Sequence, residues 1–217
     1  MGSEEIEVKI VRWAMLTLPK IKLLISMSNY RRVYVPGGTY FLTIITYQRQ
    51  PLFCDRNKID ILRNITSQVK SEMPFNIIGA VILPEHIHFI WSLPKGDRNY
   101  SKRVGRLKVL FTKSLRGENN LPQNVSLSRQ KHRESNVWQR RFWEHTIKDE
   151  RDLNVHLDYI HYNPVKHGYV SCPHLWEFSS FHSWVKKDAY PLEWACNCNG
   201  NKNKVPNFDA IKNTIGE

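Results

Sequence analysis

The sequence predicts an α+β fold, namely a ferredoxin-like antiparallel sheet with helices on one face, plus a C-terminal helix that carries a tyrosine. Two observations predict it. Segments rich in β-branched and aromatic residues alternate with segments whose apolar residues recur at three and four positions. Their order is strand, helix, strand, strand, helix, strand, which is the split β-α-β-β-α-β arrangement, and one further helix follows.

The first half of the chain contains four of these elements. Residues 39–46 predict a strand because they are β-branched and aromatic and follow a Pro-Gly-Gly turn signal. Residues 55–71 predict a helix that Asp55 caps. Residues 75–83 and 86–93 predict two strands joined by a tight turn at Pro84-Glu85. The apolar face of the helix consists of Ile59, Leu62, Ile65 and Val69.

The second half is less regular. Ser101 is a candidate cap for a helix with Val104, Leu107, Leu110 and Phe111 on one face. Residues 116–137 are polar and predict a loop, and residues 137–147 contain a fourth strand. A last helix is predicted from Asp149 to Asn163, ended by Pro164 and Gly168.

Charge points to a polyanionic partner. The formal net charge of the 217 residues is +12, and 41% of residues are hydrophobic, as in an ordinary soluble domain. Residues 95–151 hold 15 Lys and Arg against 6 Asp and Glu, so +9 of the excess lies there. A concentrated basic stretch suits nucleic acid, although a solvated surface gives the same composition.

The domain plan has three parts. Residues 1–26 are an extension outside the fold, residues 27–195 form the domain, and residues 196–217 form a polar tail. No segment is long and apolar enough to span a membrane. We therefore expect a cytoplasmic protein.

The four cysteines are interpreted as free thiols in a reducing compartment. Their spacing does not form CxxC pairs. The alternative is a zinc site, disfavoured by irregular spacing, that uses Cys172, His174, Cys196 and Cys198.

His86 and His88 form the sharpest local pattern. They are two residues apart on a predicted strand, so their side chains lie on the same face of the sheet. Two imidazoles side by side make half of a divalent-metal site. The alternative is that both rings merely fill a half-buried sheet face.

Tyr159 and Asn163 form the second pattern. They are four residues apart, so they share one face of the last helix. A phenol and an amide oxygen can face one metal from there, with the tyrosine as a nucleophile that the cation activates. The alternative is a tyrosine that packs in the core.

Residues 138–145 interleave aromatic side chains with arginines. This pattern suits stacking on unpaired bases together with contacts to phosphates. A strand with one packed aromatic face and one solvated basic face is the alternative.

Taken in order, these motifs resemble the HUH endonuclease superfamily and, within it, the REP-associated tyrosine transposases, relatives of the IS200-type transposases. The resemblance covers roughly residues 28–195. The matching residues are Tyr30-Arg31-Arg32, Gly37-Gly38-Thr39, Leu83 to His88, Trp138-Gln139, Arg141 to His145, Asp158-Tyr159-Ile160, Asn163 to Gly168, Trp176, Phe178-Ser179 and Tyr190-Pro191.

The resemblance implies a role for each candidate residue. His86, His88 and Asn163 would bind the metal, Mg²⁺ or Mn²⁺, and Tyr159 would be the nucleophile, with Tyr162 as a competing candidate. Residues that would bind DNA are Tyr30, Arg31, Arg32, Arg103, Arg106, Arg140, Arg141 and Lys166, the first three by reading a tetranucleotide at the foot of a hairpin.

The implied activity is cleavage of single-stranded DNA beside a hairpin. The hairpins are repetitive extragenic palindromes (REP), and the intermediate is a 5′-phosphotyrosine that a 3′-OH can reverse. The partners would be single-stranded DNA and DNA hairpins, the protein would be nucleoid-associated, and a monomer is expected with a dimer possible. The tail can lie near the active site in such relatives.

Two other functions compete with this hypothesis. A non-catalytic hairpin-binding protein would keep the basic surface but would not need the histidines and Tyr159 together. A metal-dependent RNA endonuclease on the same fold would form no covalent adduct.

Overall fold

The protein is described here by a computed structural model that covers residues 32–117, 126–131, 135–197 and 206–216. The predicted extension over residues 1–26 lies outside these ranges, as do Tyr30, Arg31 and Cys198. The compact unit that contains the sheet begins at Arg32.

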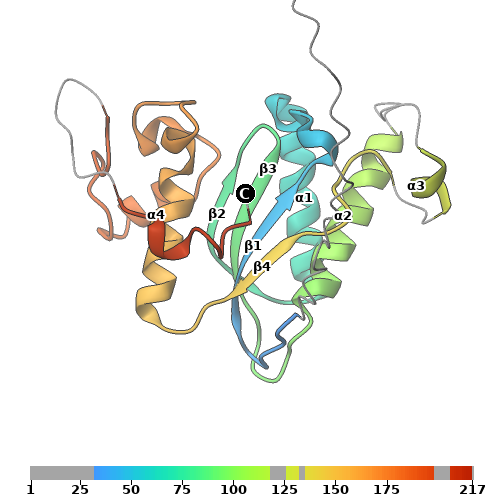
Figure 1. The fold of residues 1–217 in the computed structure, drawn as a ribbon, viewed down its shortest axis with the longest axis horizontal. Helices are drawn as coiled ribbons and strands as arrows, with labels where there is room; N and C mark the ends of the chain where they lie inside the picture. The colour runs from blue at the N-terminus through green and yellow to red at the C-terminus, as the bar shows by residue number, and fades with distance from the viewer. Residues whose placement is uncertain (1–31, 118–125, 132–134, 198–205, 217) are drawn as a thin grey trace, which may run out of the picture. The chain divides into compact units, whose positions relative to one another are not determined.

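A four-stranded antiparallel sheet forms the centre of this unit (Figure 1), and it confirms the predicted ferredoxin-like arrangement. The strands are β1 (Thr39–Ile45), β2 (Asn76–Ile82), β3 (His86–Ser92) and β4 (Trp143–Thr146). Their order across the sheet is β2-β3-β1-β4. In the pairing of the two central strands, Thr43 lies opposite His88 and Ile45 lies opposite His86.

Helices α1 (Arg56–Glu72) and α2 (Tyr100–Gly117) cover one face of the sheet. Asp55 caps α1 by accepting a hydrogen bond from the backbone N–H of Asn57, as its position predicted. Helix α2 begins at Tyr100, so Ser101 is its second residue and not its cap. The odd-numbered residues of β3 pack against these helices in the main core. They are Ile87, Phe89 and Trp91.

Helix α4 (Glu150–Lys166) packs on the opposite face, against Phe41, Val81 and Ile90. It ends three residues later than predicted, because Pro164 lies inside its last turn instead of ending it. Gly168 follows its end with a φ of 72°, a left-handed conformation that suits glycine. The sheet therefore has helices on both faces, and the face bearing α4 is also the face of His86 and His88.

The remaining elements are short. They are α3 (Leu127–Lys131), α5 (Phe181–Val185), and the 3₁₀ turns Tyr47–Arg49, Leu52–Cys54, Pro173–Leu175 and Asp209–Ile211. The predicted loop over residues 116–137 is thus interrupted by α3. No helix among the described residues is long and apolar enough to cross a membrane.

The last described segment, residues 206–216, is packed and not a free polar tail. Its side chains Ile211 and Ile215 are buried, only 5% and 6% exposed. They join the cluster that α4 forms with the sheet. The polar composition of the tail did not indicate that these two isoleucines, four residues apart, would be buried.

The prediction of four free cysteines is wrong for two of them. Cys172 and Cys196 form a disulfide, although they are 24 residues apart. Cys54 is an exposed free thiol, as expected. Nothing in the local spacing of the cysteines identified this pair, because it depends on how the segment after α4 folds back.

Candidate active site

The two histidines of β3 are fully buried, with 0% exposure each, and their rings lie 4.8 Å apart between centroids. The His86 Nδ1 donates a hydrogen bond of 2.9 Å to the Glu85 carboxylate. That hydrogen bond lowers the pKa of Glu85 to about 2, so the carboxylate is charged near neutral pH. An ionised carboxylate holds the proton of His86 on Nδ1 and leaves Nε2 as the atom that can bind a metal.

A second hydrogen-bond chain fixes His88 in the same tautomer. The Thr43 hydroxyl lies 3.0 Å from Nδ1 of His88 and donates its one proton to the backbone carbonyl of Ile215 at 2.6 Å. Thr43 can therefore only accept from the histidine, so His88 donates from Nδ1. Both rings present Nε2 in the form that coordinates cations, which makes the pair fit for a divalent metal.

Tyr159 comes from α4 and is also fully buried, with 0% exposure. Its ring meets the edge of the His88 ring with centroids 5.5 Å apart. Lys166, two turns further along the helix, donates a hydrogen bond of 2.8 Å from Nζ to the tyrosine hydroxyl. The structure thus brings a phenol, a cation and an imidazole together from a helix and a strand.

Asn163 lies one turn after Tyr159 on the same helix and is 0% exposed. Its backbone carbonyl accepts the hydrogen bond of the helix cap from His167. The His167 ring lies 5.3 Å from the His86 ring between centroids. His167 is a neighbour of the site that the strand and helix periodicities did not identify, because it lies beyond the last helical turn.

Tyr162 shares Phe208 with Tyr159 and otherwise has different ring neighbours. Its ring packs on Phe208 and Trp194, with centroids 5.8 Å and 6.5 Å away. Burial raises its pKa above the usual value for tyrosine. Of the two tyrosines, Tyr159 is the one whose ring contacts His88 and whose hydroxyl accepts a hydrogen bond from a lysine.

The described C-terminal segment covers this site. The Phe208 ring lies edge-on to Tyr159 with centroids 5.2 Å apart, and Ile215 accepts the hydrogen bond from Thr43. Trp143 donates from its indole N–H to the carbonyl of Thr214 at 2.7 Å. Residues 206–216 therefore lie between α4 and the strands β1 and β4 (Figure 1).

The arginines named from the sequence divide into interior and surface groups. Arg103 is 2% exposed, and it donates to the carboxylate of Asp97 and to the carbonyls of Met73 and Pro74. It therefore fastens α2 to the α1–β2 turn, and this burial removes it from any surface that binds DNA. Arg106 is exposed and pairs with Glu72 through two hydrogen bonds.

The other basic candidates are also more accessible than Arg103. Arg32 lies over the Phe142 ring at 4.0 Å and donates to the Ser101 hydroxyl at 2.6 Å. Arg140 and Arg141 are exposed. Arg140 lines a pocket of about 460 Å³ beside α2. The other cationic residues that line this pocket are Lys108, Lys113, Arg116 and Arg129.

Comparison with known proteins identifies the class. Residues 34–163 match the family of IS200-like transposases. A Haemophilus influenzae protein provisionally named a REP-associated tyrosine transposase is 46% identical over 171 residues, which is 79% of this chain and 95% of that one. A REP-associated tyrosine transposase of Escherichia coli is 40% identical over 169 residues, covering 78% of this chain and 92% of the other.

A solved structure agrees with both. It is of a REP-associated tyrosine transposase bound to a REP hairpin, has a TM-score of 0.65 and 37% identity, and covers 83% of this chain and 99% of its own. The fold and the matches define a transposase enzyme. The chain belongs to the IS200-like transposase family, among the REP-associated tyrosine transposases.

Proposed function

We propose that this transposase is a metal-dependent single-strand DNA endonuclease and strand transferase that acts beside DNA hairpins of the REP type. Tyr159 is the proposed nucleophile, and the intermediate is a 5′-phosphotyrosine. One observation carries the proposal: the Tyr159 ring contacts the His88 ring, and the Tyr159 hydroxyl accepts a hydrogen bond from Lys166. The sequence identity to named tyrosine transposases supports the same chemistry.

The proposed metal ligands are His86, His88 and Asn163. Hydrogen bonds from Nδ1 of both rings support this assignment, because they direct the Nε2 lone pairs to a cation. Mg²⁺ or Mn²⁺ suits a mixed set of imidazole and amide oxygen with room for phosphate oxygens. When bound, such an ion polarises the scissile phosphate and offsets the negative charge that develops on it.

The side chains of the chain carry the remaining steps. The Tyr159 oxygen attacks phosphorus and loses its proton, while the bond from phosphorus to the 3′ oxygen breaks and that oxygen takes up a proton. Lys166 stabilises the negative charge that the phenol oxygen gains before the attack. Attack by a 3′-OH on the phosphotyrosine reverses the step and joins strands without an added energy source.

The proposed DNA surface includes Arg140, Arg141 and Arg32, with Tyr30 and Arg31 preceding it in the chain. Support comes from their charge, from the exposure of Arg140 and Arg141, and from the related structure, which is bound to a REP hairpin. Aromatic and guanidinium groups side by side, as in Arg32 over Phe142, suit contacts to bases and phosphates.

A gel assay tests the proposal. A labelled REP-type hairpin with single-stranded flanks is incubated with the protein and Mn²⁺, and the products are separated under denaturing conditions. We expect a covalent protein–DNA band that a chelator prevents and that Tyr159→Phe abolishes. Tyr162→Phe is the matched control, because it removes a phenol hydroxyl three residues further along the same helix. This variant should keep the band.

The competing functions give other outcomes. Tight hairpin binding with no adduct at any metal concentration would make the protein a hairpin-binding protein. Cleavage of the matching RNA without any covalent band would make it an RNA endonuclease.

A further inference from the structure

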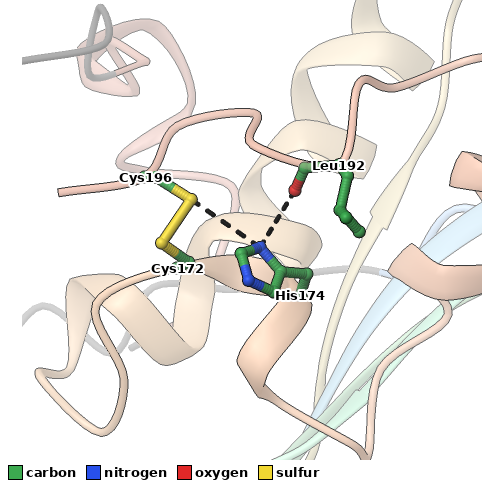
Figure 2. Close-up of a disulfide and its surroundings, with 4 residues drawn as sticks. All are labelled: Cys172, His174, Leu192 and Cys196. Atoms are coloured by element: carbon green, nitrogen blue, oxygen red, sulfur yellow. Dashed lines mark hydrogen bonds between the residues drawn. A yellow bond between two sulfur atoms is a disulfide. The ribbon is translucent and has the colours of Figure 1, made fainter. Parts of the chain in front are cut away.

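Cys172, His174 and Cys196, which all follow α4 in the chain, gather outside the site described above (Figure 2). Their three ligand atoms lie within 4.8 Å of one another. Both cysteines are buried, 3% and 4% exposed. The structure joins their sulfurs in a disulfide, and His174 Nδ1 lies 3.7 Å from the sulfur of Cys196.

We propose that, with the disulfide reduced, these three side chains form a zinc site. Tetrahedral zinc has bonds of about 2.3 Å to sulfur and about 2.0 Å to imidazole nitrogen, which sets a sulfur and a nitrogen ligand about 3.6 Å apart. The distance of 3.7 Å between Cys196 Sγ and His174 Nδ1 matches this spacing. The two sulfurs need to separate by about 1.7 Å from a normal disulfide distance.

The backbone holds the two segments together without the disulfide. Asn197 donates from its N–H to the carbonyl of Ser171 at 2.8 Å, one residue outside each cysteine. The Trp194 ring packs on Phe181 with centroids 6.0 Å apart. The ligands therefore stay close when the disulfide opens, and a preformed site loses little chain entropy on binding.

The proposal rests on the proposed function, because a protein that acts on chromosomal DNA works where thiols are kept reduced. A dithiol reductant converts the disulfide to two thiols and is itself oxidised to a cyclic disulfide. Zinc then displaces the two thiol protons. The His174 proton moves to Nε2, since Nδ1 exchanges its contact with the Leu192 carbonyl for coordination. Water or another thiolate completes the four ligands.

Such a site would fasten the start of the C-terminal segment. Cys196 follows Ala195, which packs in a small cluster with Tyr162 and Val165 of α4 and with Phe208. The same Phe208 lies on the Tyr159 ring. Zinc at Cys196 would thus secure the beginning of the segment over residues 196–217. The last described part of that segment, residues 206–216, covers the candidate active site.

Cobalt substitution tests the zinc site on the full chain. The protein is reduced, freed of metal and titrated with Co²⁺, because cobalt bound to thiolates absorbs in the near ultraviolet and cobalt bound to imidazoles alone does not. We expect the thiolate band to saturate at one equivalent and to disappear when Zn²⁺ is added. Cys172→Ser and Cys196→Ser should remove it, and the exposed-thiol control Cys54→Ser should keep it.

A second variant guards against loss of folding. His174→Gln keeps both thiols and should weaken zinc binding about 100-fold or more while the circular dichroism spectrum stays unchanged. A folded, reduced wild-type protein without the cobalt–thiolate band would overturn the zinc site. So would a band that survives Cys172→Ser.

The two proposals fail separately. If the thiolate band is absent while Tyr159 still forms the covalent DNA adduct, the zinc site is wrong and the transposase mechanism stands. If the band is present and no adduct forms, the zinc site stands and the mechanism is wrong.

Discussion

Lys166 donates a hydrogen bond of 2.8 Å from its ammonium group to the hydroxyl of Tyr159, seven residues earlier on α4. The same ammonium lies 4.9 Å from the centre of the Tyr159 ring. Two turns of one helix therefore carry both the proposed nucleophile and a cation placed to stabilise its charged form. Lys166 is one of the residues that the family resemblance implies for DNA binding, and this contact gives it a second proposed role.

Removing the ammonium should slow cleavage more than it weakens binding. We expect Lys166→Met to lower the rate of adduct formation about 100-fold, as expected for the loss of one donor to a developing negative charge. Hairpin affinity, measured by gel shift, should change less than about tenfold, since one phosphate contact contributes that much at most. Lys166→Arg, which keeps the charge, should retain most of the rate. Equal losses in rate and affinity would show that the lysine binds DNA only.

Loosening the C-terminal segment should raise activity. Phe208→Ala removes the ring that covers Tyr159. Because about 1.4 kcal/mol of lost contact shifts the population of the open form tenfold, we expect adduct formation to rise several-fold. Leu192→Ala, an exposed apolar residue, is the control for general destabilisation. A rate that falls together with the melting temperature would mean that the segment only completes the fold.

His161 should make the fold sensitive to mild acid. Burial lowers its pKa to about 3, and its Nε2 lies 3.0 Å from the hydroxyl of Ser180. The unfolded chain takes up a proton near pH 6.5 while the folded chain does not, so stability is complete above that pH and is lost as the pH falls towards 3. The contribution is about 1.4 kcal/mol per pH unit in this window. The free energy of unfolding, measured by urea denaturation, should depend less steeply on pH in His161→Gln than in the wild type, by that amount.

If the free energy of unfolding of His161→Gln depends on pH as steeply as that of the wild type, His161 is not a buried neutral group that destabilises the fold in acid. The comparison of the two proteins matters, because other buried groups act in the same direction. Burial lowers the pKa of His156 too, and that histidine is present in both.

The basic pocket beside α2 should contribute to DNA affinity without sequence preference. The double variant Lys113→Glu, Arg116→Glu reverses two exposed charges that line it. We expect weaker hairpin binding, and a plot of log affinity against log salt whose slope is smaller by about 2. Lys70→Glu, an exposed lysine on α1, is the control. The double variant changes the net charge by −4 and Lys70→Glu by −2, so an effect of Lys70→Glu half as large as that of the double variant would mean that only net charge matters.

Local periodicity predicted which side chains share one face of a strand or a helix. The alternation on β3 correctly placed His86 and His88 on one face, because a strand leaves no other choice. The apolar spacing of α1 likewise predicted its buried side, with Ile59 and Val69 at 1% and 0% exposure. The four-residue spacing of Tyr159 and Asn163 put both on the buried part of α4.

Contacts between distant segments could not be predicted in this way. Thr43 contacts Ile215 across 172 residues, and Cys172 contacts Cys196 across 24, and neither pair follows from a period. The family resemblance placed Arg103 among the DNA-binding residues, but its partners are the carbonyl of Pro74, before β2, and the carboxylate of Asp97, just before α2. A charge can be counted in a sequence, whereas its burial depends on the packed partner.

The central claim is that Tyr159 is the residue that becomes linked to DNA. Its direct test is to digest the trapped protein–DNA adduct with protease and nuclease and to locate the phosphonucleotide on the helix peptide by tandem mass spectrometry. Both tyrosines of α4 are present in one peptide, so each serves as the control for the other. We predict modification at Tyr159 alone. Modification at Tyr162, or a cleaved product with no modified tyrosine, would contradict the account.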